Sequence, residues 1–190
     1  MRGRHRVRRR AGVGVLVALS AAALAGCAGD VQSTAAHPAR SAIEAYLRQV
    51  EPVRLAVNKL LTQADPILHA YHDGRASPAQ AGRRMDRLER RFAAYTVDIA
   101  AIEPATPELR TLQAEYAHTY VLEDAYLSAL ASGLGERELD NLPDTQAAQR
   151  AAIIAWRTGL TVLARQARVA LPADLQQAGR GDIAPEPDGS

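Results

Sequence analysis

The feature that most limits the fold of this chain is a single stripe of apolar side chains that recurs on four successive segments. The segments cover approximately residues 41–72, 78–103, 107–132 and 144–171. In the second of them the stripe steps by three and four residues in alternation, the spacing of one side of an α-helix; its members are Met85, Leu88, Phe92, Tyr95, Ile99 and Ile102. A helix with one apolar side is unstable alone in water, so we expect the four segments to pack against one another.

Short breakers between the segments indicate where the helices begin and end. Gly74 follows the first segment, and Ser77-Pro78 supplies an N-cap and a first helical residue for the second. Thr106-Pro107 does the same for the third. The composition agrees, because 47% of the residues are hydrophobic but only 4% are aromatic, and alanine and leucine prevail over the residues typical of strands. The sequence therefore predicts an all-α fold, an antiparallel up-down-up-down four-helix bundle.

Two prolines interrupt the first helical segment. Pro52 and Pro66 each lack a backbone donor and clash with the preceding turn, which costs ~3 kcal/mol inside a regular helix. We expect the helix to be kinked or broken there. The favoured explanation is a bend that wraps the helix around the bundle. The alternative is a gap in the hydrogen-bond ladder that lines a pocket.

The first 26 residues have the plan of a secretory signal peptide. Six arginines among the first ten residues precede an uncharged run, residues 11–26, which ends in small side chains. That run is shorter than the roughly 20 apolar residues that cross a bilayer. We therefore expect the segment to be removed on export rather than to remain as a membrane span.

The end of that run is more specific. Leu24-Ala25-Gly26-Cys27 resembles the lipobox of bacterial lipoproteins. The resemblance implies that a dedicated signal peptidase recognises the first three of these residues and cuts before Cys27, which then carries a thioether-linked diacylglyceryl group. Cys27 is also the only cysteine, so no internal disulfide is available to explain it. The chain as a whole resembles bacterial surface lipoproteins with helical exported domains, which implies anchoring but no particular activity. The consecutive arginines leave the choice between general and twin-arginine export open.

Under this interpretation the chain has four parts. They are a lipoprotein signal peptide at 1–26, a lipidated tether at 27–40, the four-helix bundle at 41–172 and a disordered tail at 173–190. Removal of the signal peptide takes away six arginines and no acid, which leaves 17 basic against 21 acidic residues and changes the net charge from +2 to −4. A mature chain of that charge is not expected to bind nucleic acid.

Glu123 is the most informative polar residue, because it falls in the middle of the apolar stripe of the third segment. A buried carboxylate needs a partner or a raised pKa. If neighbouring helices are antiparallel, Glu123 lies near the level of Asp65, Arg87 and Arg157. We expect a core ion pair between Glu123 and Arg157 that fixes the helix register. The alternative is a ligand contact made by Glu123, Arg157 or Asp65.

The sequence shows no pattern typical of a metal site or of catalysis. A dimetal bundle needs paired Glu-x-x-His repeats, and His69 and His72 lack a clear fourth ligand. Motifs for haem attachment, phosphate binding and a nucleophilic serine are missing from the sequence. The six tyrosines either line a pocket between helices or, as we favour, place their rings in the core and their hydroxyls at its rim. We therefore expect no cofactor, no bound metal and no enzymatic activity.

These observations favour a membrane-anchored, extracytoplasmic lipoprotein whose helical domain is an interaction or binding module of the cell envelope. The diacylglyceryl group on Cys27 is its expected contact with the membrane, and an envelope protein its expected partner. The alternative function is a sensor or carrier that holds a small ligand between the helices near Pro52, Pro66 and Glu123.

Overall fold

The computed structural model describes residues 30–176, with side chains from residue 38 onward. Its regular elements are α1 (Asp30–Leu61), α2 (Ala64–His72), α3 (Pro78–Ala100), α4 (Pro107–Glu136) and α5 (Gln146–Gln166). Within the described range no strand occurs. The prediction of an all-α fold is therefore confirmed for this part of the chain.

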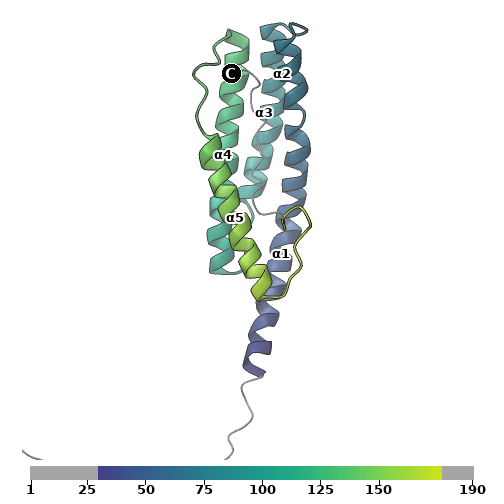
Figure 1. The fold of residues 1–190 in the computed structure, drawn as a ribbon, viewed down its shortest axis with the longest axis vertical. Coiled ribbons are helices and arrows are strands. Elements are labelled where there is room, and N and C mark those ends of the chain that lie inside the picture. Colours follow the sequence, from purple (N-terminus) through teal and green to yellow (C-terminus); the bar gives the residue numbers. More distant parts are fainter. Residues whose placement is uncertain (1–29, 177–190) are drawn as a thin grey trace, which may run out of the picture.

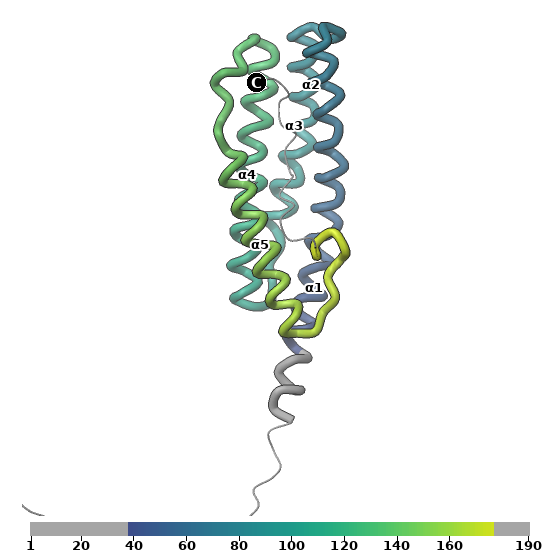
Figure 2. The backbone as a smooth tube through the Cα atoms, viewed as in Figure 1, coloured from purple at the N-terminus to yellow at the C-terminus, as the bar shows by residue number. Residues whose placement is uncertain are grey.

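The helices lie side by side along the long axis of the molecule (Figure 1; Figure 2). The most extensive contact is between α3 and α4; α4 also packs on α5, and α3 also packs on α1 and α2. Direct contact between α1 and α5 is slight. The space among the helices is filled by large side chains such as Met85, Phe92, Leu127 and Trp156, which are all fully buried. Met85 and Phe92 belong to the stripe of the second segment described above, and Leu127 and Trp156 lie on the stripes of the third and fourth segments.

The first predicted helix is in fact two helices. The helix is interrupted at Thr62 and Gln63, and α2 starts two residues before Pro66. Pro66 thus lies in the first turn, where its missing N–H costs no helical hydrogen bond. Pro52, by contrast, lies inside a continuous α1.

Helix α1 also begins earlier than the sequence predicts. It starts at Asp30 rather than at Ser41, so most of the segment expected to be a coiled tether is helical. This first part of α1 extends beyond the ends of the other helices (Figure 1). A helix rises about 1.5 Å per residue, so the 30–40 segment is ~16 Å long.

The predicted helix starts at Ser77 and Thr106 are confirmed. The Ser77 hydroxyl accepts a hydrogen bond from the backbone of Gln80, whose side chain bonds back to the backbone N–H of Ser77, and Pro78 opens α3. Thr106 caps α4 through the backbone N–H of Leu109. These caps, of which the one at Ser77 is reciprocal, satisfy backbone donors that a helix start leaves unpaired.

The chain after α5 folds back as a strap, which we define as residues 168–176. The turn into it occurs at Arg168, whose φ of 56° lies in the left-handed region. Leu171 and Leu175 of the strap join the apolar core, with 8% and 1% of their surface exposed. The packed structure therefore continues past the boundary predicted at 172 and includes the first residues of the predicted tail. Residues 177–190 lie outside the described part.

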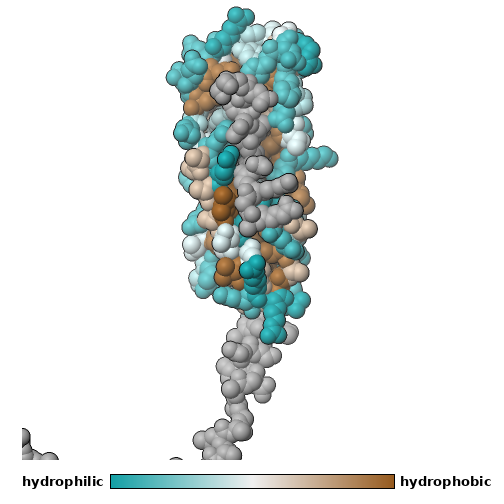
Figure 3. Space-filling model, in the orientation of Figure 1, coloured by the Kyte–Doolittle hydropathy of each residue, from teal (hydrophilic) through white to brown (hydrophobic). Residues whose placement is uncertain are grey.

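The surface is mostly hydrophilic on the face drawn in Figure 3, with small separate apolar areas. The large apolar side chains that are exposed come from four helices: Leu55, Val97, Val121, Ile154 and Val162. Single exposed apolar residues of this kind are normal on a protein surface. They give no reason to place a binding site on any one of these helices.

A glycine pair tests the close approach of α3 to α4. A Cβ atom added to Gly82 would lie 2.9 Å from the backbone oxygen of Ala131 and 3.1 Å from the backbone nitrogen of Gly135, whereas one added to Gly135 meets nothing within 4 Å. We expect Gly82→Ala to lower the free energy of unfolding by about 1–2 kcal/mol, since the helices must separate. Gly135→Ala should raise it by up to ~1 kcal/mol through helix propensity. Urea denaturation of both variants checks this, and equal effects would contradict the packing.

Candidate functional site

A chain of hydrogen bonds crosses the interior and joins four helices. The indole N–H of Trp156 on α5 donates to the hydroxyl of Tyr46 on α1 at 2.8 Å. That hydroxyl donates to the side-chain oxygen of Gln113 on α4, also at 2.8 Å. The Gln113 amide in turn donates to the backbone oxygen of Ile99 on α3 at 2.6 Å. Because each helix contributes one group, the bonds hold all four in one register.

Aromatic rings pack beside this chain of hydrogen bonds. Trp156 stacks on Tyr116 with ring centres 4.0 Å apart. Tyr116 meets Tyr120 edge to face at 5.4 Å, and their hydroxyls are 3.3 Å apart. Tyr120 stacks on Phe92 of α3 at 5.7 Å. The ladder runs from α5 through α4 to α3, so the polar and aromatic contacts tie the same helices together.

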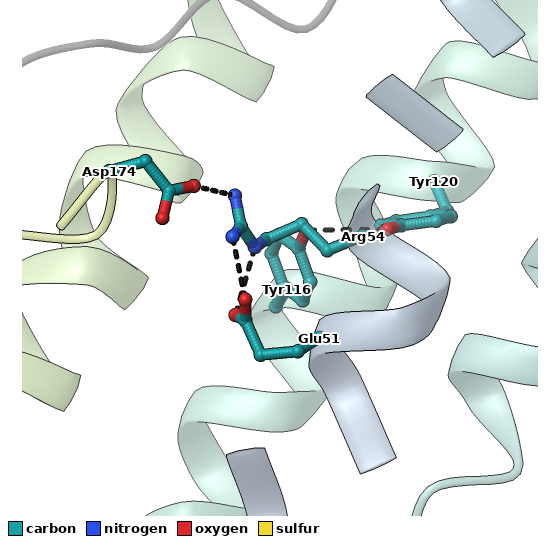
Figure 4. Close-up of polar contacts among 5 residues, drawn as sticks. All are labelled: Glu51, Arg54, Tyr116, Tyr120 and Asp174. Carbon is teal, nitrogen blue, oxygen red and sulfur yellow. Dashed lines mark hydrogen bonds and ion pairs between the residues drawn. The ribbon is translucent and has the colours of Figure 1, made fainter. Parts of the chain in front are cut away.

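Arg54 of α1 is a buried cation next to this ladder (Figure 4). Its side chain is 4% exposed and binds both oxygens of Glu51, at 3.0 and 2.7 Å. Its remaining terminal nitrogen, Nη1, lies 2.5 Å from a carboxylate oxygen of Asp174, which belongs to the strap and has a side chain 52% exposed. A charge taken out of water needs such partners, because an unpaired one costs several kcal/mol.

The pKa values of these groups follow from their surroundings. Burial on its own would lower the pKa of Arg54, but the hydrogen bonds that Arg54 donates to the carboxylates of Glu51 and Asp174 outweigh this effect, and the pKa rises. Burial raises the pKa of Tyr46 and Tyr116, and raises that of Tyr120 to about 12. The three phenols therefore stay protonated at neutral pH, where they serve as hydrogen-bond donors rather than as bases.

Glu123 is fully buried, as its position in the stripe indicates, but its hydrogen-bond partner is an uncharged side chain. Its Oε2 accepts a hydrogen bond from the side chain of Gln149 on α5 at 3.0 Å. Its Oε1 is buried and has no hydrogen-bond partner among the described residues. Burial raises the pKa of Glu123 to about 7, although the bond from Gln149 opposes the rise. The carboxyl group can thus take up a proton near neutral pH.

The other residues singled out in the sequence do not gather at Glu123. Arg157, its expected ion-pair partner, is half-buried on α5, and Gln149 holds the carboxylate instead. Asp65 is exposed in the first turn of α2. Cys27 and the three residues before it, Leu24, Ala25 and Gly26, lie outside the described residues.

The tyrosines differ from the expected arrangement. The hydroxyls of Tyr46, Tyr116 and Tyr120 bond inside the bundle rather than at its rim. Tyr71 and Tyr95, by contrast, are half-buried. The hydroxyls of Tyr46, Tyr116 and Tyr120 are thus engaged by contacts within the protein, which gives these three a structural role.

A shallow open depression lies between the start of α3 and the end of α4. Its volume is about 360 Å³, and its lining includes Gly82, Arg83, Asp86, Ala131 and Glu136. The lining does not include Pro52, Pro66 or Glu123.

In the described part of the chain, no three histidine, cysteine or acidic side chains are grouped so as to hold a metal ion.

Sequence reasoning missed two buried polar residues, Gln113 and Arg54, although the sequence contains a signal for both. Gln113 occupies the stripe position between Leu109 and Tyr116, and Arg54 occupies the one between Val50 and Val57. A polar residue at such a position has to find a buried partner.

Comparison of the chain with protein-family models, with characterised proteins and with solved structures gives no match. Function must therefore be argued from these residues.

Proposed function

We propose that this chain is a lipid-anchored protein of the bacterial cell envelope, facing outside the cytoplasm, whose helical domain binds other envelope components and catalyses no reaction. In this proposal α1 and α2 together form the first arm of an antiparallel up-down-up-down bundle, with α3, α4 and α5 as the others. A diacylglyceryl group on Cys27 holds the domain at the membrane.

One observation carries the proposal. The lipobox-like Leu24-Ala25-Gly26-Cys27 is followed almost at once by α1, which begins at Asp30 and extends past the other helices before they pack (Figure 1). A helix at this place is a stiff stalk rather than a coil, so it would add ~16 Å between Asp30 and the packed helices. In the described residues, no helix has the length and apolar character needed to cross a bilayer. Attachment through Cys27 does not require one.

The alternative of a small-ligand sensor or carrier has less support. It needs a cavity that touches Glu123, and the depression between α3 and α4 has a different lining. The hydroxyls of Tyr46, Tyr116 and Tyr120 already have hydrogen-bond partners inside the bundle, so they are not open to a ligand.

Replacing Cys27 with alanine tests the anchor. We expect wild type, expressed in a bacterial host with a lipoprotein pathway, to incorporate an alkyne-labelled fatty acid and to sediment with membranes. Cys27→Ala should incorporate none and leave the lipid-anchored fraction, because the thioether cannot form. Ser33→Ala, a change just after the box, is the matched control and should behave as wild type. Equal labelling of Cys27→Ala and wild type would contradict the proposal.

In-cell cross-linking of the same strains tests the binding role. A partner captured reproducibly by wild type and Ser33→Ala, but not by Cys27→Ala, would support an anchored interaction module. Wild type that is anchored but copurifies with a stoichiometric small molecule would support the sensor or carrier instead.

A further inference from the structure

The strap covers a side of the bundle that the helices themselves leave weakly closed. α1 and α5 make only slight direct contact. The strap leaves the end of α5 and returns beside α1 (Figure 2). Leu171 and Leu175 enter the core from this segment, and Val169 packs against it half-buried. A short irregular segment therefore completes the core at this side.

The polar contact of the strap reaches from the surface to a buried cation. Asp174 is half exposed, whereas the Arg54 side chain that it meets is 4% exposed. Glu51 already occupies the Nε–Nη2 edge of the guanidinium with two hydrogen bonds. The outward Nη1 is the position that Asp174 fills (Figure 4). Arg54 and Glu51 are thus a preformed receptor for one further carboxylate.

The strap is held as a docked peptide would be. The hydrogen bonds that the structure gives for residues 171–176 are local: the backbone N–H groups of Leu175 and Gln176 donate to the Pro172 oxygen, and the Gln176 side chain donates to the Leu171 oxygen. Residues 171–176 are attached to the helices through two leucines, Leu171 and Leu175, and one carboxylate, that of Asp174. Recognition through a few spaced side chains is the usual way in which a groove or seam selects a short peptide.

We propose that the surface beneath the strap, the strap site, is a binding site for a partner peptide in which an acidic residue directly precedes a leucine, and that the strap occupies it as an internal competitor. The strap site consists of Arg54, Glu51 and the core surface that Leu171 and Leu175 cover. The inference rests on the proposed role as an interaction module and supplies its binding site and the chemistry of its partner.

The competition has a defined consequence for affinity. A tethered segment has an effective concentration near the millimolar range, so it outcompetes a free peptide of the same sequence. An external peptide should therefore bind the wild type weakly and bind a variant with a weakened strap at least ~10-fold more tightly. A carboxylate-to-amide change in the peptide should remove most of the gain, because Nη1 of Arg54 would lose its charged partner.

The test uses full-length protein in mild detergent and a fluorescein-labelled peptide with the sequence of residues 167–176, ARVALPADLQ. Fluorescence anisotropy gives the peptide affinity of wild type, of Asp174→Ala/Leu175→Ala and of the milder Asp174→Asn. Because Asp174→Asn keeps both leucines, it still tests the proposal if the double variant does not fold. Asp86→Ala is the matched control, because Asp86 is a similarly exposed acid that pairs with an arginine, Arg90, away from the strap. It should bind as weakly as wild type.

The result expected is tighter binding by both strap variants, and its loss when the peptide carries asparagine at its aspartate. Equal affinity of wild type and the folded strap variants would overturn the proposal, as would binding that does not depend on the peptide carboxylate. A strap variant that dimerises instead of binding peptide would overturn it too, by showing that a second copy fills the site. None of these outcomes depends on Cys27, so failure of the anchor and failure of the strap site are distinguishable.

Discussion

Replacing Tyr46 with phenylalanine is expected to lower the free energy of unfolding by about 2–4 kcal/mol, although only one oxygen is lost. The Tyr46 hydroxyl accepts from Trp156 and donates to Gln113, each at 2.8 Å. Removing it leaves a buried N–H and a buried carbonyl oxygen unpaired, and each such group costs about 1–3 kcal/mol. Urea denaturation followed by circular dichroism measures the loss.

Tyr95→Phe is the matched control for this change. Tyr95 is a half-buried tyrosine of α3 for which the structure gives no hydroxyl hydrogen bond to a described residue. Its replacement should change the free energy of unfolding by less than ~0.5 kcal/mol. A double-mutant cycle of Tyr46→Phe with Trp156→Phe should show coupling of at least ~1 kcal/mol. Additive effects would mean that the bond between α1 and α5 contributes nothing.

The helices were predictable because their signals are local. The three-and-four spacing of Met85, Leu88 and Phe92 and the caps at Ser77 and Thr106 each act within a few residues of the chain. The early start of α1 was not predictable in this way, since residues 30–40 have no apolar stripe. The break before Pro66 was indicated by that proline, while Pro52 shows that one proline need not end a helix that packs well.

The candidate site was less predictable, because its partners depend on how helices meet. Glu123 was identifiable as a buried carboxylate from its stripe. Its partner was not, since Gln149 and Arg157 lie about two turns apart on α5, and the axial position of that helix against α4 decides which of them reaches Glu123. Asp174 was harder still: it lies 120 residues after Arg54, in a segment whose composition suggests disorder. A contact of that kind comes from tertiary structure alone.

The pH dependence of stability is the second large effect, and it centres on Glu123. Burial raises its pKa from 4.5 to about 7, so the folded protein binds this proton more tightly than the unfolded chain. The bound proton therefore stabilises the folded protein in full below pH ~4.5, and this stabilisation is lost as the pH rises through about 7. At higher pH the buried, ionised carboxylate lowers the free energy of unfolding. At ~1.4 kcal/mol for each pKa unit, the cost at pH 8 is about 3 kcal/mol.

Glu123→Gln removes that cost while keeping the shape of the side chain and an oxygen for Gln149. We expect the variant to match wild type near pH 4.5 and to be more stable by up to ~3 kcal/mol at pH 8. Urea denaturation at half-unit steps between these values measures the difference, and Glu115→Gln, an exposed acid on the same helix, should differ from wild type by less than ~0.5 kcal/mol throughout. A gap between Glu123→Gln and wild type that does not change with pH would mean that Glu123 does not titrate in the folded protein. Loss of stability at pH 8 would mean that the charged carboxylate has a stabilising partner, and Arg157, the partner expected from the sequence, would then be the first to examine.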